Sequence, residues 1–110
     1  MIEFGIQGKK MKLEEIIERI SKLRIRKKYS ARELSLMIDK SESYISRLEY
    51  RKDFEPSIKV INDIAEACES NLEEFFYYDI DQYRYDHELL QLIKTMPIGK
   101  KQALIEFLKK

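Results

Sequence analysis

The most informative part of the chain is residues 29–76, which read YSARELSLMIDKSESYISRLEYRKDFEPSIKVINDIAEACESNLEEFF. Near its start, Ser30 is followed three residues later by Glu33. This spacing is a capping box, in which the serine oxygen and the glutamate carboxylate satisfy backbone amides at the first turn of a helix. We therefore predict a helix over residues 31–38.

A second short helix is predicted almost immediately afterwards. Ser41 stands three residues after Ile38 and is a suitable cap for a helix over residues 42–51. Only Asp39 and Lys40 separate the two helices in this reading. The sequence therefore predicts that two short helices meet across Asp39 and Lys40.

Helices are also predicted on both sides of this pair. Apolar residues at helical spacing indicate a helix over residues 14–27 before it, and another that opens at Pro56 and Ser57 after it. Asn71 is placed to cap a fifth, short helix. The residues expected to close one core among these helices are Ile20, Leu23, Leu34, Ile45, Ile61, Ile64 and Phe75.

The last third of the chain has a different pattern. Residues 77–86 carry four tyrosines without a clear period and are expected to form a linker. Apolar stripes then predict helices over residues 86–95 and 100–109, separated by Pro97 and Gly99 into a helical hairpin. This hairpin carries more apolar surface than two helices can hide on each other. It packs on its own domain or pairs with a second chain, and we expect pairing.

The composition agrees with an all-α chain. The 110 residues are 44% apolar and 37% charged, with three glycines and two prolines, which indicates one compact helical domain with a small appendage. We expect an amino-terminal tail (1–12), a five-helix domain (13–78) and a linker with a helical hairpin that serves as the dimerisation element (79–110). No apolar run approaches the roughly 18 residues of a membrane span, so we expect a cytoplasmic protein without a membrane partner.

The sequence shows none of the residue patterns that indicate an enzyme. Cys68 and His87 are its only cysteine and histidine, so a disulfide within the chain and a multi-cysteine zinc site are excluded. No glycine-rich phosphate loop and no nucleophile with a matching base is evident. We expect Cys68 to be a core residue, and we expect no enzymatic activity, cofactor, metal or small-molecule ligand.

Charge is distributed unevenly along the chain. Residues 22–52 hold ten lysines and arginines against four acidic residues, a net charge of plus six. Residues 53–78 hold one lysine against seven acidic residues, a net charge of minus six. A basic segment beside an acidic one is typical of a molecule that turns one side towards an anion, and nucleic acid is the anion we expect.

Residues 29–76 resemble the lambda-repressor-like (Cro-type) family of helix-turn-helix regulators. The resemblance covers about residues 14–76 and rests on Leu34 and Ser35 in the second helix, Ile45 in the third and Glu49 soon afterwards. It implies a five-helix domain whose third helix enters the major groove of DNA. It also implies a left-handed turn at Asp39, where the family has a glycine, and aspartate adopts this conformation more readily than most residues. By the same resemblance, Arg24 and Glu49 form a structural salt bridge between the first and third helices.

The resemblance also implies the residues that meet DNA bases. Glu42, Ser43 and Arg47 match the base-reading positions of the family. Arginine bonds guanine in bidentate fashion, and a glutamate accepts a hydrogen bond from the cytosine amino group. Residues around them are expected to contact phosphate, namely Lys40, Ser41, Tyr44, Arg51 and Lys52.

The function expected from these features is sequence-specific DNA binding. A repressor that occupies a palindromic double-stranded operator as a homodimer is the simplest form, because one reading helix contacts only a few base pairs. A protein-interaction module, such as an antirepressor or an antitoxin-like adaptor, is the alternative. Three residues favour it: Ala31, where the family has a phosphate-contacting glutamine, and the carboxylates of Asp53 and Glu55.

Overall fold

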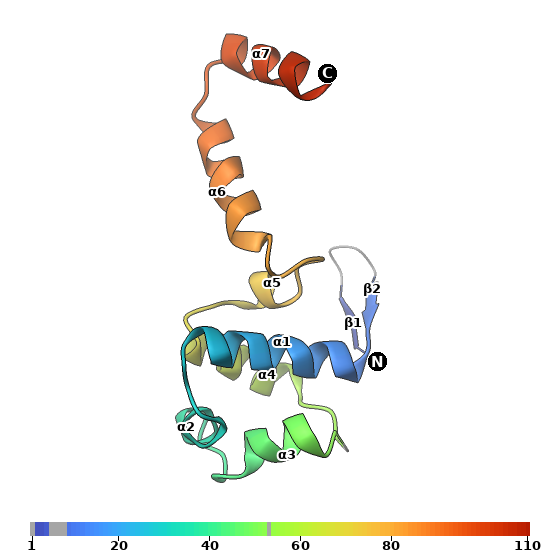
Figure 1. The fold of residues 1–110 in the computed structure, drawn as a ribbon, viewed down its shortest axis with the longest axis vertical. Coiled ribbons are helices and arrows are strands. Elements are labelled where there is room, and N and C mark those ends of the chain that lie inside the picture. Colours follow the sequence, from blue (N-terminus) through green and yellow to red (C-terminus); the bar gives the residue numbers. More distant parts are fainter. Residues whose placement is uncertain (1, 5–8, 53) are drawn as a thin grey trace. The chain divides into compact units, whose positions relative to one another are not determined.

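The computed structural model describes residues 2–4, 9–52 and 54–110. These residues form two short strands and seven helices (Figure 1). In chain order they are β1 (Ile2–Phe4), β2 (Lys9–Met11), α1 (Leu13–Arg26), α2 (Ala31–Met37), α3 (Tyr44–Tyr50), α4 (Ile58–Ala67), α5 (Leu72–Phe75), α6 (Tyr83–Lys94) and α7 (Ile98–Leu108). The chain divides into two compact units, Met1–Tyr78 and Asp79–Lys110. None of the described helices is long and apolar enough to cross a membrane.

Three helices begin where the sequence predicts, because short-range hydrogen bonds fix their starts. The Ser30 hydroxyl accepts a hydrogen bond from the Glu33 amide, and the Glu33 carboxylate accepts one from the Ser30 amide, both at 3.0 Å. Ser57 caps α4 and Asn71 caps α5 by accepting from the amide three residues later, at 3.2 and 2.8 Å. The predicted capping box, the predicted cap at Asn71 and the predicted opening of a helix at Pro56 and Ser57 are confirmed.

Four helices of the first unit end without glycine. One residue past the C-cap of α1, α2, α3 and α4, the backbone is left-handed at Lys28 (φ 61°), Asp39 (φ 58°), Lys52 (φ 57°) and Glu69 (φ 57°). The next amide turns back to the helix, as when Tyr29 donates to the Arg24 carbonyl at 3.1 Å. The left-handed conformation predicted for Asp39 is confirmed, at a steric cost of roughly 1–2 kcal/mol for a residue with a Cβ atom.

The core lies between the helices of the first unit. All seven residues expected in it have no exposed surface, and Ile16, Leu48 and Cys68 are equally buried. In this core α1 contacts α3 and α4, and α2 contacts α3 and α4 (Figure 1). The expected all-α class, with a domain of five helices, is confirmed, and two short strands that were not expected precede α1.

The amino-terminal segment differs from the expected tail. The described part of it contains β1 and β2, which pair in antiparallel register with Ile2 opposite Met11 and Phe4 opposite Lys9. Met11 is buried, so β2 adjoins the apolar core. Strands of three residues are too short to show a periodicity, which is why the sequence does not reveal them.

The second unit consists of α6 and α7. α6 begins at Tyr83 rather than at Asp86, so the linker is shorter than predicted. The Tyr83 ring is buried and stacks on His87, with ring centroids 5.6 Å apart. α7 begins at Ile98, before its predicted start. The large apolar side chains of this unit that are about half or more exposed are Leu89, Leu90, Leu92, Ile98, Ile105, Phe107 and Leu108.

Candidate nucleic-acid interface

A buried serine joins α2 to α3. The Ser35 hydroxyl has no exposed surface, donates to the Ala31 carbonyl at 2.8 Å and accepts from the Ile45 amide at 3.0 Å. Ile45 lies in the first turn of α3, where amides have no partner within the helix. Ser35 therefore caps α3 from the neighbouring helix and holds the first turn of α3 against α2. From the sequence, Ser35 is expected only as part of the family pattern, because its contact with Ile45 joins two separate helices.

The start of α3 differs from the prediction. The sequence assigns Ser41 as the cap of a helix over residues 42–51, but α3 spans Tyr44–Tyr50 and its N-cap position is Ser43, which makes no side-chain cap bond. The Ser41 carbonyl instead accepts from the Tyr44 amide at 3.0 Å. The capping signal of Ser41 is overridden because Ser35 supplies the cap through a contact that is distant in the sequence.

A bidentate ion pair fixes α3 to α1. The Arg24 guanidinium donates from Nε and Nη2 to the two carboxylate oxygens of Glu49, at 2.9 and 2.8 Å. Its Nη1 donates to the Tyr29 carbonyl at 3.0 Å. The bond to Glu49 raises the pKa of Arg24, and only 17% of the Arg24 side chain and 9% of the Glu49 side chain are exposed. The structure thus contains the salt bridge that the resemblance implies.

The outer side of α3 carries a row of polar groups. Ser43 and Arg47 stand one helical turn apart, and both are exposed. Tyr50 lies one further turn along and is 83% exposed. Tyr50 is not among the residues predicted to contact DNA, although its spacing of three residues from Arg47 is a signal that places both on one helix face. A hydroxyl, a guanidinium and a phenol on one face are the kinds of group that contact base edges and phosphates.

Tyr44 is held in place by ring contacts. Its ring meets Phe54 edge to face, with centroids 5.5 Å apart, and the Lys40 ammonium lies 5.4 Å from the Tyr44 centroid. Burial raises the pKa of the Tyr44 phenol, against the opposing charge of Arg47. The hydroxyl therefore stays protonated and is able to donate a hydrogen bond.

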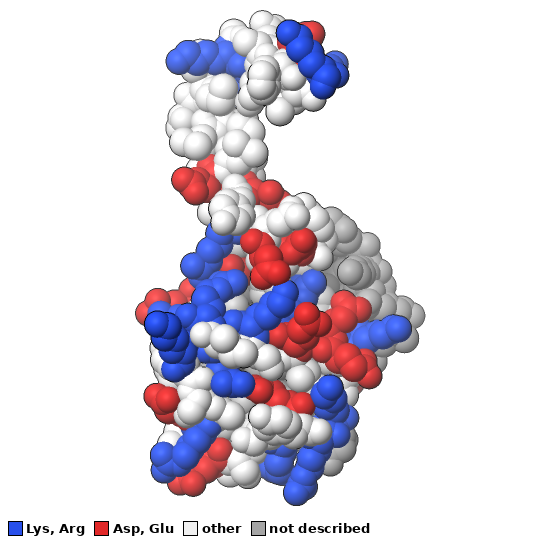
Figure 2. All heavy atoms as spheres, in the orientation of Figure 1, with Lys and Arg blue, Asp and Glu red and all other residues white. Residues whose placement is uncertain are grey.

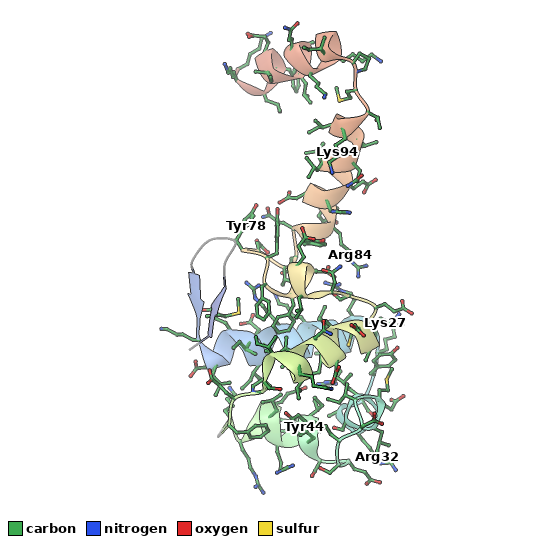
Figure 3. All side chains as sticks on the ribbon, turned by 180° about the vertical axis from the view of Figure 1, so that it is seen from behind. Lys27, Arg32, Tyr44, Tyr78, Arg84 and Lys94 are labelled. Atoms are coloured by element: carbon green, nitrogen blue, oxygen red, sulfur yellow. The ribbon has the colours of Figure 1, made fainter. Side chains whose placement is uncertain are left out.

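Glu42 forms an ion pair with Arg32, a residue to which the sequence pattern assigns no role. The Arg32 guanidinium on α2 donates from Nη2 to Oε1 of Glu42 at 3.1 Å. The hydrogen bond and the charge of Arg32 lower the pKa of Glu42, and Glu42 raises the pKa of Arg32 in return. Figure 3 shows Arg32 and Tyr44 at the end of the first unit formed by α2 and α3.

Ion pairs decide which cations are available to an external anion. Of the basic residues in 22–52, five form ion pairs: Lys22 with Glu18, Arg24 with Glu49, Arg26 with Glu74, Lys27 with Glu69 and Arg32 with Glu42.

The other basic residues of this segment form no ion pair with any residue that the structure describes: Lys28, Lys40, Arg47, Arg51 and Lys52. All but Lys28 lie in the turn, on α3 or just beyond it, and all are exposed. Figure 2 shows lysine and arginine side chains at the lower end of the view, where Figure 1 places α2 and α3. Within residues 22–52, the cations left for an external anion are therefore concentrated around α3.

The residues that favour the alternative reading are only partly described. Ala31 is half-buried at the start of α2, and Glu55 is exposed before α4. Asp53 lies outside the described residues. Lys22, Arg24, Arg26 and Lys27 form ion pairs with acidic residues. Residues 31–52, which contain the turn and α3, carry five basic and four acidic side chains, a much smaller excess of positive charge than that of residues 22–52.

Cys68 is a core residue, as expected. Its side chain has no exposed surface, and burial raises the pKa of its thiol to about 11 despite the nearby charges of Lys27, Arg26 and Arg24. A buried, protonated thiol is a poor nucleophile. Within residues 2–4, 9–52 and 54–110, no group of three or more His, Cys, Asp or Glu side chains is placed to hold a metal ion.

Comparison with known families agrees with this geometry. A family model described as helix-turn-helix matches residues 20–75, slightly more than half of the chain. The match begins within α1 and ends with α5, so it contains α2, the turn and α3. No curated protein and no solved structure matches the chain.

Proposed function

The chain belongs to the helix-turn-helix family of DNA-binding regulators, and we propose that it is a sequence-specific transcriptional repressor that reads the major groove with α3. One observation carries this proposal. Among residues 22–52, the exposed cations that form no ion pair with a described residue are Lys28 and four others in the turn, on α3 or just after it, and a phosphate backbone binds such cations through release of its condensed counterions. The family is a regulatory one, and we assign no catalytic role.

Three residues are proposed to meet base edges. Arg47 is exposed on α3, and its guanidinium, which forms no ion pair with a described residue, is suited to bidentate bonds to guanine O6 and N7. Ser43, one turn earlier, offers a hydroxyl that is not used as a helix cap. Glu42 offers a carboxylate, the acceptor that suits the cytosine amino group.

The surrounding polar residues are proposed to contact phosphates. Such contacts fix the register of the protein on the duplex without specifying sequence. In this account Lys40 and Tyr44 flank the turn, with the Lys40 ammonium over the Tyr44 ring, and Arg51 and Lys52 follow the end of α3. Ser41 contributes its exposed hydroxyl rather than a helix cap.

The second unit is proposed to join two chains into a homodimer that binds a palindromic operator. One reading helix contacts too few base pairs for operator affinity, whereas two-fold dimers bind half-sites about 34 to 36 Å apart. The apolar side chains on α6 and α7 that are about half or more exposed supply a surface that a second copy would cover.

Sedimentation of the full-length protein tests this assembly. We expect a dimer at micromolar concentration, and a monomer when Leu92 and Phe107 are both replaced by glutamate. Ile58→Glu is the matched control, because Ile58 is a partly exposed apolar residue of the first unit, and it should leave the dimer intact. A wild-type monomer, or a dimer that survives both substitutions, would remove the second unit from this role.

Selection from a randomised DNA pool tests the function itself. The purified protein should enrich a palindromic sequence, and affinity for the enriched sequence should fall steeply with salt because several phosphates are neutralised. A protein without enrichment at low salt would instead be a protein-interaction module with this fold. The near balance of charge over residues 31–52 is the observation that favours this second candidate.

A further inference from the structure

The carboxylate of Glu42 occupies an unusual place for an acidic group at a DNA-binding surface. Glu42 lies in the turn before α3, and its side chain is 65% exposed. A carboxylate there repels phosphates unless something offsets its charge. The Arg32 guanidinium on α2, 3.1 Å away, provides the offsetting charge.

The bond to Arg32 leaves part of the carboxylate available. Arg32 donates to Oε1 of Glu42, and Oε2 makes no hydrogen bond with a described residue. The pair spans the helix-turn-helix, because Arg32 stands on α2 and Glu42 precedes α3. Because Ser35 fixes α2 against the first turn of α3, the backbone of Arg32 keeps a constant position relative to Glu42.

A structural purpose does not account for this pair. Both side chains are about two-thirds exposed, and exposed ion pairs add little to the stability of a fold. The partly buried pair of Arg24 and Glu49 already attaches α3 to the rest of the unit. The Arg32–Glu42 pair therefore constrains a side chain at the surface rather than the position of the helix.

We propose that Arg32 is a positioning residue that orients Glu42 to select cytosine. This inference rests on the proposed function. Arg32 holds Oε1 and compensates its charge, so Oε2 is left to accept a hydrogen bond from the N4 amino group of cytosine in the major groove. Guanine offers only acceptors there, and the adenine amino group adjoins the N7 acceptor, so both bases meet the carboxylate less favourably.

The test measures base preference, which a merely structural role would not change. Competition binding against every single-base variant of the selected operator is compared for wild type, Arg32→Ala, Glu42→Gln, the double variant and Lys52→Ala. Lys52→Ala is the matched control, because it removes an exposed cation that forms no ion pair with a described residue. It should weaken binding to all sequences alike.

We expect Arg32→Ala and Glu42→Gln to flatten the preference for cytosine at the same single position, each by about tenfold. The double variant should be no flatter than Glu42→Gln alone, because Arg32 acts through Glu42. Arg32→Lys should retain part of the preference. In the absence of DNA, the titration midpoint of the Glu42 carboxyl, followed by NMR, should rise in Arg32→Ala, since the bond that lowers its pKa is lost.

Two results would overturn the inference while leaving the proposed function standing. One is a uniform loss for Arg32→Ala, like that of Lys52→Ala, which would make Arg32 a phosphate contact. The other is an intact cytosine preference in Arg32→Ala while Glu42→Gln loses it. If the wild-type protein selects no operator at all, the proposed function fails and the inference fails with it.

Discussion

Replacement of Arg24 by alanine tests how α3 is held in its reading position. The substitution removes two charge-assisted hydrogen bonds to Glu49 and a third to the Tyr29 carbonyl. It leaves a carboxylate with only 9% of its side chain exposed and no cation beside it. Removal of one partner from a buried ion pair costs 3–5 kcal/mol, and we expect about 3 kcal/mol because this pair reaches the solvent at one edge.

The opposite substitution should cost less. In Glu49→Ala the guanidinium keeps its bond to the Tyr29 carbonyl and, at 17% exposure, reaches water more easily than the carboxylate does. We expect a loss of about 2 kcal/mol, and a double variant that is less destabilised than the sum of the two single losses.

Thermal unfolding followed by circular dichroism measures both effects. For a domain of this size, 3 kcal/mol corresponds to a decrease of roughly 12 to 24 °C in Tm. Lys59→Ala, which breaks the exposed pair of Lys59 with Asp63, is the control and should leave Tm unchanged. Equal Tm values for Arg24→Ala and Lys59→Ala would refute the argument that the Arg24 pair is structurally important.

Three further changes test other parts of the structure. Ser35→Ala leaves the buried Ile45 amide without a partner and should destabilise the fold by about 1 to 3 kcal/mol in chemical denaturation, whereas Ser43→Ala, which removes no cap bond, should not. Lys28→Gly should stabilise by about 1 kcal/mol because glycine accepts the left-handed backbone, and a gain of the same size for Lys28→Ala would argue against this cause. Burial raises the pKa of the Cys68 thiol to about 11, so the unfolded chain loses this proton at lower pH than the folded protein does. The free energy of unfolding should therefore decrease as pH rises from about 8.5 towards 11. At pH 8 a thiol reagent should label the unfolded protein far faster than the native one, and equal rates would contradict the buried position.

The parts of the fold that the sequence predicts are those fixed by nearby residues. The capping box of Ser30 and Glu33 spans three residues, and the caps of α4 and α5 are equally local. The predicted start of α3 is wrong because it depends on a contact between two helices. Its first-turn amide is satisfied by Ser35, which lies ten residues away, so a capping signal at Ser41 carries no information about that contact.

Those parts of the candidate site that depend on local spacing or on the family pattern can be predicted from the sequence. Helical spacing places Ser43 and Arg47 on one exposed face, and a family pattern anticipates the pair of Arg24 with Glu49. The partners of the other cations could not be read from the sequence. Lys27 pairs with Glu69 across 42 residues and Arg26 with Glu74 across 48, so a count of charges along the chain overstated the positive charge available to DNA.

Binding of the Arg47→Ala variant to operator and to random DNA is the most direct test of whether α3 reads the major groove through Arg47. Fluorescence anisotropy with duplexes carrying the selected operator or a scrambled sequence gives both affinities under one salt condition. We predict a loss of about 1 to 3 kcal/mol on the operator, relaxed preference at one base pair, little change on scrambled DNA and an unchanged Tm. An equal loss on both duplexes would reduce Arg47 to a phosphate contact, and an operator affinity equal to that of wild type would contradict the claim that α3 reads the major groove through Arg47.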